Sequence, residues 1–114
     1  MKLINKTNNT VISENVMVAD TFVTRLKGLM FTKKLLEEDA LHIIPCNGIH
    51  TFNMRYSIDV LYLDKSQIII AIDEDMRPRR IGRVVKNSAS VVELPRGKVK
   101  KLDIKTVQAL QFME

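Results

Sequence analysis

Three residues with metal-binding side chains, His42, Cys46 and His50, are spaced four positions apart. Imidazole and thiolate groups suit zinc or copper, so the trio is a candidate metal site. Pro45 and Gly48 disfavour a helix here, but a strand, a turn and a second strand can still bring the two histidines together. We favour ordinary packing instead, because no carboxylate stands at the offset of a zinc signature. The sequence therefore predicts no metal and no cofactor.

Cys46 and His50 are also a candidate nucleophile and general base. That chemistry requires a thiol with a lowered pKa and nearby donors for an oxyanion, and the sequence carries a signal for neither. A small side chain in the turn Pro45–Gly48 is the simpler interpretation.

Two carboxylates, Asp59 and Glu93, stand in apolar runs that predict strands. Alternate residues of a strand face opposite sides, so each carboxylate shares its row with apolar side chains. A buried carboxylate is costly unless a cation or several donors receive it. The pair can do acid–base chemistry, or each can hold an arginine, Arg25 or Arg55, in a structural ion pair. We favour the ion pairs because they require fewer coincidences.

Most of the positive excess lies in Arg77–Lys86 and Arg96–Lys101. Such clusters can hold phosphates, so a weak binder of anionic partners through Arg77–Arg83 and Lys98–Lys101 is one functional hypothesis. The clusters lack the interleaved aromatic residues on which bases stack, and the acidic run Asp73–Asp75 adjoins the first one. A solvated charged face is the simpler interpretation, and nucleic acid is not the expected partner.

The length and composition of the chain favour one domain, residues 1–114. A chain of 114 residues, 46% of them hydrophobic, is large enough for a core, although only 5% are aromatic. The single cysteine excludes an internal disulfide and suits a reducing compartment. The sequence has neither a signal-peptide pattern nor an apolar run of membrane length. We therefore expect a cytoplasmic protein with no membrane contact, and the sequence sets no oligomeric state.

Short apolar runs separated by turn residues predict the β-strands that position these groups. The central stretch, Ile49–Asp64, predicts a strand, a turn at Arg55–Ser57 and a second strand. In the first of these, one face would carry His50, Phe52 and Met54, and the other Thr51, Asn53 and Arg55. Asp73–Ser88 predicts a long exposed loop. The other predicted strands are Lys2–Lys6, Val11–Ala19 with a break at Ser13–Asn15, Leu41–Ile44, Ile68–Ile72, Ala89–Leu94, Val99–Lys101 and Thr106–Met113.

One short helix is predicted at Phe22–Lys27, because Thr21 can cap its start and Gly28 can end it. An apolar stripe recurs at every fourth position, at Phe22, Leu26 and Met30. Evenly spaced short strands with one helix predict a mainly β fold. We expect a small antiparallel β-sandwich or barrel-like domain.

Three blocks of the sequence resemble the DUF192 family, a group of small prokaryotic domains without an established function. They are Arg25–Met30, Cys46–Asp64 and Val92–Gly97, and they occur in the family's order across most of the chain. The resemblance implies a compact, mostly antiparallel β fold with a short helix at the first block. It implies no reaction, cofactor or substrate. One departure is the last turn, Asp103–Thr106, which has no glycine where the family usually has a Gly-Asp pair.

We expect residues from the three blocks to meet at one concavity, which is the candidate site. The residues that would line it are Arg25, His50, Thr51, Asn53, Met54, Asp59 and Glu93. An apolar cleft with a few convergent polar groups is a common arrangement for ligand binding. The favoured hypothesis is a non-enzymatic domain that binds a small molecule or a protein partner there. The alternative is a small hydrolytic or metal-assisted enzyme that uses His50 with Asp59 or Glu93.

Overall fold

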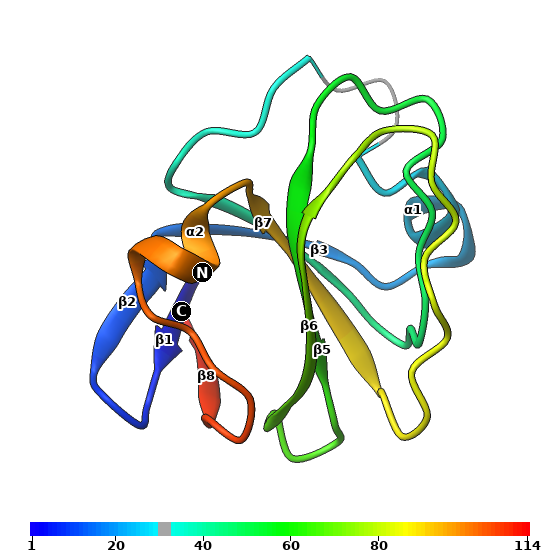
Figure 1. The fold of residues 1–114 in the computed structure, drawn as a ribbon. Coiled ribbons are helices and arrows are strands. Elements are labelled where there is room, and N and C mark those ends of the chain that lie inside the picture. Colours follow the sequence, from blue (N-terminus) through cyan, green and yellow to red (C-terminus); the bar gives the residue numbers. More distant parts are fainter. Residues whose placement is uncertain (30–32) are drawn as a thin grey trace.

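The computed structural model describes residues 1–29 and 33–114, and it shows the predicted mainly β fold (Figure 1). The strands are β1 (Lys2–Asn5), β2 (Thr10–Ser13), β3 (Asn15–Ala19), β4 (Asp39–Ile43), β5 (Ile58–Leu63), β6 (Ile69–Met76), β7 (Ser90–Pro95) and β8 (Leu110–Met113). They form a three-stranded sheet in the order β2-β1-β8 and a five-stranded sheet in the order β3-β4-β7-β5-β6. Neighbouring strands are antiparallel except β3 and β4, which run parallel.

The main core lies between the two sheets. Leu61 and Leu63 of β5 belong to this core, as do Val92 and Leu94 of β7. From the three-stranded sheet, Leu3 of β1 joins the same cluster. These side chains are withdrawn from water, and the burial of their apolar surface is what holds one sheet against the other.

The opposite face of the five-stranded sheet carries a second core, and this layer holds the candidate site. The strand residues in it include Ile43 of β4, Ile58, Val60 and Tyr62 of β5, and Val91 of β7. Leu29 and Met54, from segments outside the sheet, pack against them. All six residues of β5 are buried, because this strand has a core on each of its faces.

The predicted helix and its start are confirmed as α1 (Phe22–Lys27). Thr21 caps it: the Thr24 N–H donates to Thr21 Oγ1 at 3.1 Å, and the Thr21 N–H donates to Thr24 Oγ1 at 3.0 Å. This reciprocal pair satisfies two amides that a helix start leaves free. Gly28 ends the helix with a φ of 48°, a backbone conformation that glycine adopts without steric cost.

The apolar stripe of α1 lies largely at the surface. Phe22 is 73% exposed and Leu26 is 60% exposed, whereas Leu29, just beyond the helix, is buried. Met30, the third residue of the stripe, lies outside the described residues. The described part of the chain contains no helix of a length and hydrophobicity that would cross a membrane.

The predicted strand at Val99–Lys101 is wrong, because these residues belong to a second short helix, α2 (Lys98–Lys101). Gly97 has a φ of 87° and turns the chain directly after β7. The first amides of a helix have no partner within it. The Val99 N–H therefore donates to Asp59 Oδ2, at 2.9 Å, while the Val99 side chain packs in the main core.

The first predicted strand of the central stretch is also wrong. Its pairing is limited to one isolated bridge between His50 and Ile81. Thr51 and Met54 are buried while Asn53 is exposed, so the two expected faces do not exist. The reason is a turn: the Met54 N–H donates to Thr51 O at 3.3 Å, and Asn53 has a φ of 63°. Local turn formation overrides the alternating pattern here.

The remaining strand predictions are confirmed with shifted ends. The break at Ser13–Asn15 separates β2 from β3, which belong to different sheets. The predicted loop at Asp73–Ser88 begins only after Met76, because β6 continues along β5 as far as the pair of Ile58 and Met76. The last strand, β8, begins at Leu110 and not at Thr106.

Candidate functional site

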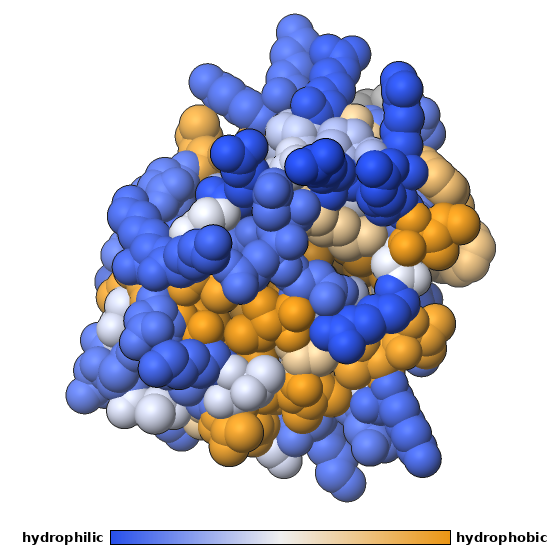
Figure 2. Space-filling model, in the orientation of Figure 1, coloured by the Kyte–Doolittle hydropathy of each residue, from blue (hydrophilic) through white to orange (hydrophobic). Residues whose placement is uncertain are grey.

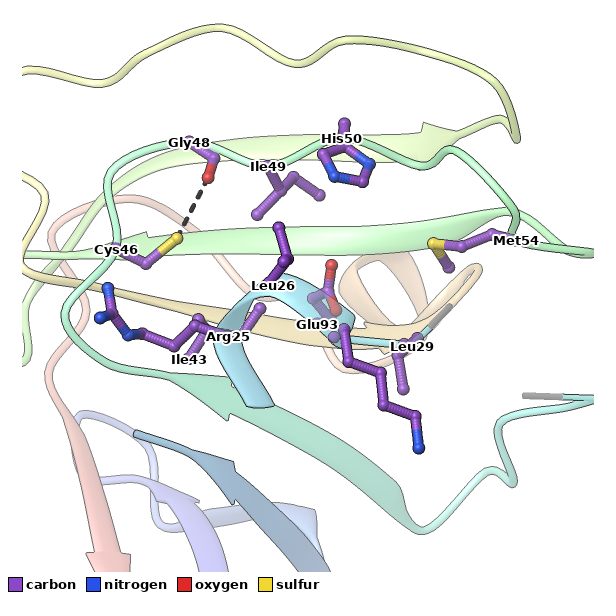
Figure 3. A pocket seen from close by; sticks show the side chains of 12 residues that line it. Arg25, Leu26, Leu29, Ile43, Cys46, Gly48, Ile49, His50, Met54 and Glu93 are labelled. Carbon is purple, nitrogen blue, oxygen red and sulfur yellow. Dashed lines mark hydrogen bonds between the residues drawn. The ribbon is translucent and has the colours of Figure 1, made fainter. Parts of the chain in front are cut away.

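A small cavity of about 150 Å³ lies between α1, the segment that follows β4, and the middle of β7 (Figure 3). We call it the Glu93 pocket, after the one carboxylic acid in its lining. Its walls are mainly apolar. The lining residues are Arg25, Leu26, Lys27, Gly28, Leu29, Ile43, Cys46, Gly48, Ile49, His50, Met54 and Glu93.

Glu93 lies on β7 with its side chain in the second core, as the alternating pattern predicts. It pairs with Leu41 of β4 and with Val60 of β5, at the centre of the sheet. The residue is only 2% exposed, and its Oε1 atom makes no hydrogen bond with any described residue. Burial raises the pKa of Glu93 to about 8, because a charged carboxylate loses its hydration inside the protein. The group is therefore mostly a neutral acid at pH 7.

Arg25 reaches the same pocket from α1. Its Nε atom is buried and makes no hydrogen bond with the described residues. One terminal nitrogen, Nη1, donates to Pro45 O at the long distance of 3.4 Å. Arg25 and Glu93 thus share a cavity without forming a hydrogen bond to each other, and the predicted ion pair between them is absent.

Cys46 and His50 both line the pocket, four positions apart along the chain. The Cys46 thiol donates to Gly48 O at 3.1 Å. Burial raises the pKa of this thiol, and the charge of Glu93 raises it further, against the opposing effects of the hydrogen bond to Gly48 and of Arg25. A thiol that stays protonated is a poor nucleophile. His50 accepts a hydrogen bond from the Phe52 N–H at its Nδ1 atom, at 3.3 Å.

His42 lies on the other face of the sheet, so the candidate metal trio does not converge. Its ring stacks on Phe112 of β8, with 4.1 Å between the ring centroids. Burial lowers the pKa of His42 to about 4, and the ring is therefore neutral at pH 7. Across residues 1–29 and 33–114, His, Cys, Asp and Glu side chains form no group of three that could hold a metal ion.

Asp59 does not line the Glu93 pocket, because it faces the opposite side of the sheet. In the register of β5 and β7, Asp59 pairs with Leu94 while Val60 pairs with Glu93. The Asp59 carboxylate accepts two backbone N–H groups, from Asp75 and from Val99, both at 2.9 Å. The expected arginine partner is thus replaced by two amide donors. Asp59 therefore ties the end of β6 and the start of α2 to β5.

Thr51 and Asn53 also lie outside the pocket lining. Thr51 is buried; its hydroxyl donates to Arg77 O at 2.6 Å and accepts the Arg80 N–H at 2.9 Å. Thr51 therefore fastens the loop after β6 to the segment before β5. Asn53 is exposed in the turn described above. Of the seven residues predicted for the site, the structure gathers Arg25, His50, Met54 and Glu93 in one pocket.

The same sequence blocks identify the family. The sequence profile of DUF192, described as Uncharacterized ACR, COG1430, matches residues 3–112. This chain belongs to the DUF192 family. A UPF0127 protein of Thermococcus sibiricus is 35% identical over 100 residues, which cover 83% of this chain and 64% of that protein. The DUF192 chain thus spans less than two thirds of that relative's length.

Two solved structures share the fold of this DUF192 protein. A protein of unknown function from Novosphingobium aromaticivorans has a TM-score of 0.85 and 18% identity, over 97% of this chain and 82% of that one. A Sinorhizobium meliloti protein, provisionally named a transcription regulator, has a TM-score of 0.84 and 21% identity, over 96% of this chain and 89% of that one. At these identities the likeness shows the fold alone.

All three DUF192 blocks contribute to the Glu93 pocket. Sequence reasoning did not include Gly28, Leu29 and Cys46 in the site, although Gly28 and Leu29 stand in the first block and Cys46 opens the second. Their position within the blocks that resemble the family could have identified these three residues as part of the site. Gly28 lies beside the carboxyl group, because a Cβ atom at this position would be in van der Waals contact with Glu93 Oε1, at 3.8 Å.

Exposed apolar side chains line two neighbouring hollows that share residues with the Glu93 pocket. Besides Phe22 and Leu26 of α1, they include Phe52, Ile81 and Val84 from the two loops beside it. Figure 2 shows apolar groups at the surface on the side of the molecule that carries α1, among hydrophilic ones. Apolar surface next to the pocket favours a ligand with an apolar body.

Proposed function

We propose that this DUF192 protein binds a small organic molecule in the Glu93 pocket. The observation that carries the proposal is the buried Glu93 carboxyl, whose Oε1 atom has no hydrogen-bond partner among the described residues. A buried polar group without a partner costs about 1–3 kcal/mol. A ligand that supplies the missing hydrogen bond recovers this free energy, and a functional role accounts for keeping the acid there.

The shape and lining of the pocket limit the ligand. A volume of about 150 Å³ corresponds to a molecule near the size of benzene. Ile43, Ile49 and Met54 supply apolar walls, so the body of the ligand is apolar. One polar group must reach Glu93, which donates to an acceptor when neutral and attracts a cation when ionised.

Small probes of this size test the proposal. We expect n-butylamine or n-butyramide to shift the NMR signals of the Met54 methyl group and of Ile43 in the full chain. Glu93→Gln should weaken the binding of n-butylamine by about tenfold or more, because the charge-assisted hydrogen bond is lost. Glu74→Gln removes an exposed carboxylate of β6 and should bind as the native protein does.

Two results would contradict the proposal. One is the absence of any pocket shift with either probe at millimolar concentration. The other is binding of n-butylamine to Glu93→Gln with the native affinity, since the buried acid would then play no part.

A further inference from the structure

We infer that the ligand of the Glu93 pocket is a small zwitterion of the ω-amino acid type, with its ammonium group on Glu93 and its carboxylate on Arg25. This inference rests on the proposed function and adds the chemical class of the ligand. Its basis is geometric: two buried polar atoms of opposite character, from two different elements, share one cavity and both lack a hydrogen-bond partner among the described residues.

The Glu93 end of the pocket has room for an ammonium group. Glu93 projects from β7, and Gly28 stands opposite without a side chain. The Cβ atom that any other residue would have at position 28 would be 3.8 Å from Glu93 Oε1, which is within contact distance. Gly28 therefore leaves the approach to the carboxyl oxygen open.

The Arg25 end suits a carboxylate. A guanidinium binds a carboxylate through two parallel N–H groups, and Nε with a terminal nitrogen forms one such pair. The buried Nε atom of Arg25 makes no hydrogen bond with the described residues. Its Nη1 atom donates to Pro45 O at the long distance of 3.4 Å.

The two ends are separated by an apolar middle. In Figure 3 the Arg25 guanidinium lies on the Cys46 side of the pocket, away from the Glu93 carboxyl, and Leu26 lies between them in this view. Cys46 does not compete for the ligand's polar groups, because its thiol donates to Gly48 O. A ligand with a short methylene chain between its charges would contact the apolar middle and satisfy both ends.

The test compares probes that carry one charge or both. We expect titration calorimetry of the native chain to show that γ-aminobutyrate or δ-aminovalerate binds about tenfold or more tightly than n-butylamine, the gain of a second charge-assisted contact. Arg25→Met should lose this gain and still bind n-butylamine, which also shows that the variant folds. Lys65→Met, which removes one positive charge from the exposed turn between β5 and β6, should keep the gain.

The outcomes separate this inference from the proposed function. If n-butylamine and both amino acids bind the native chain with equal affinity, the inference of a zwitterionic ligand is wrong and the proposed function still stands. A gain that survives in Arg25→Met would overturn the assignment of the carboxylate to Arg25. Failure of n-butylamine, n-butyramide and both amino acids to bind the native chain would overturn both proposals.

Discussion

At the scale of the residue, Glu93 behaves unlike a surface glutamate because it is a neutral acid within an apolar pocket. The other titratable residues that line this pocket are Arg25 and Lys27 of α1, Cys46 and His50. Burial raises the pKa of Glu93 to about 8. The native protein therefore holds a proton that the unfolded chain gives up above its ordinary pKa of 4.5.

This proton makes stability depend on pH in a defined direction. Between about pH 4.5 and 8 the unfolded state binds fewer protons than the native state at Glu93, so the free energy of unfolding should fall as pH rises, by at most about 1.4 kcal/mol per pH unit. Glu93→Gln stays neutral and should lose this slope, which urea unfolding across the range would measure. Parallel slopes in the two proteins would mean that Glu93 is not a buried acid.

At the scale of the element, Asp59 joins β5 to α2 and to the part of β6 where the register of the β5–β6 pair shifts. Its carboxylate accepts the N–H of Asp75 near the end of β6 and the N–H of Val99 in α2. Both amides would otherwise be left without an acceptor at this position. Asp59 therefore holds α2 over the sheet together with the Val99 side chain, which packs in the main core.

Replacing Asp59 by alanine should destabilise the fold by about 3 kcal/mol, because buried amide donors are left unsatisfied. Urea unfolding at pH 7 would measure the change. The matched control is Glu74→Ala, which removes an exposed carboxylate from β6 and should change stability little. A cost for Asp59→Ala no larger than that of the control would show that the two amide contacts contribute nothing.

The contact between the two sheets includes His42 of β4, whose ring stacks on Phe112 of β8. Its Nε2 atom is buried without a hydrogen-bond partner in the part of the chain that the structure describes. Because burial lowers the pKa of His42 from 6.5 to about 4, protonation opposes folding. His42 therefore lowers the stability of the fold as pH falls, whereas Glu93 lowers it as pH rises.

Acid should therefore weaken the inter-sheet contact through His42. As pH falls from about 6.5 to 4, His42 becomes protonated in the unfolded chain but stays neutral in the native protein. The free energy of unfolding should therefore fall over this range. His42→Phe should remove this loss while keeping a ring against Phe112. The difference between the two proteins, measured by urea unfolding at each pH, cancels the contribution of Glu93. A difference that does not vary with pH would contradict a buried neutral His42.

At the scale of the whole molecule, local patterns were enough to predict most strands but not how they meet. Alternation correctly placed Asp59 with the leucines of β5, and Glu93 on the opposite row from its neighbours Val92 and Leu94. The register of β5 against β7, which places the two carboxylates on opposite faces, depends on contacts distant in the sequence. The turn at Asn53 likewise overrode an alternating pattern. The pocket itself forms only when α1 docks near β7.

Several positive charges of the molecule form ion pairs with acidic residues. The formal net charge is +5, but Arg83 pairs with Asp73 at 3.1 Å and the buried Lys98 pairs with Glu37 at 3.4 Å. Lys101 contacts the same glutamate at 3.0 Å. The two basic segments of the sequence are thus partly neutralised within the fold.

We therefore expect weak attraction to polyanions. The protein should leave a heparin column at low salt, because ion pairs with Asp73 and Glu37 engage cations of both basic segments and fewer counterions are then released. Retention to high salt, and its loss on replacing Arg77, Arg79 and Arg80 together, would instead support an anionic partner on the loop after β6.

The most direct test of the account is an NMR titration of the Glu93 side-chain carboxyl carbon in the native protein. Since the acid is buried and unpaired, its signal should move with a midpoint near pH 8, and a bound ammonium ligand should lower that midpoint. A midpoint near 4.5, the ordinary value of a glutamate, would mean that Glu93 is hydrated or ion-paired and would contradict the account.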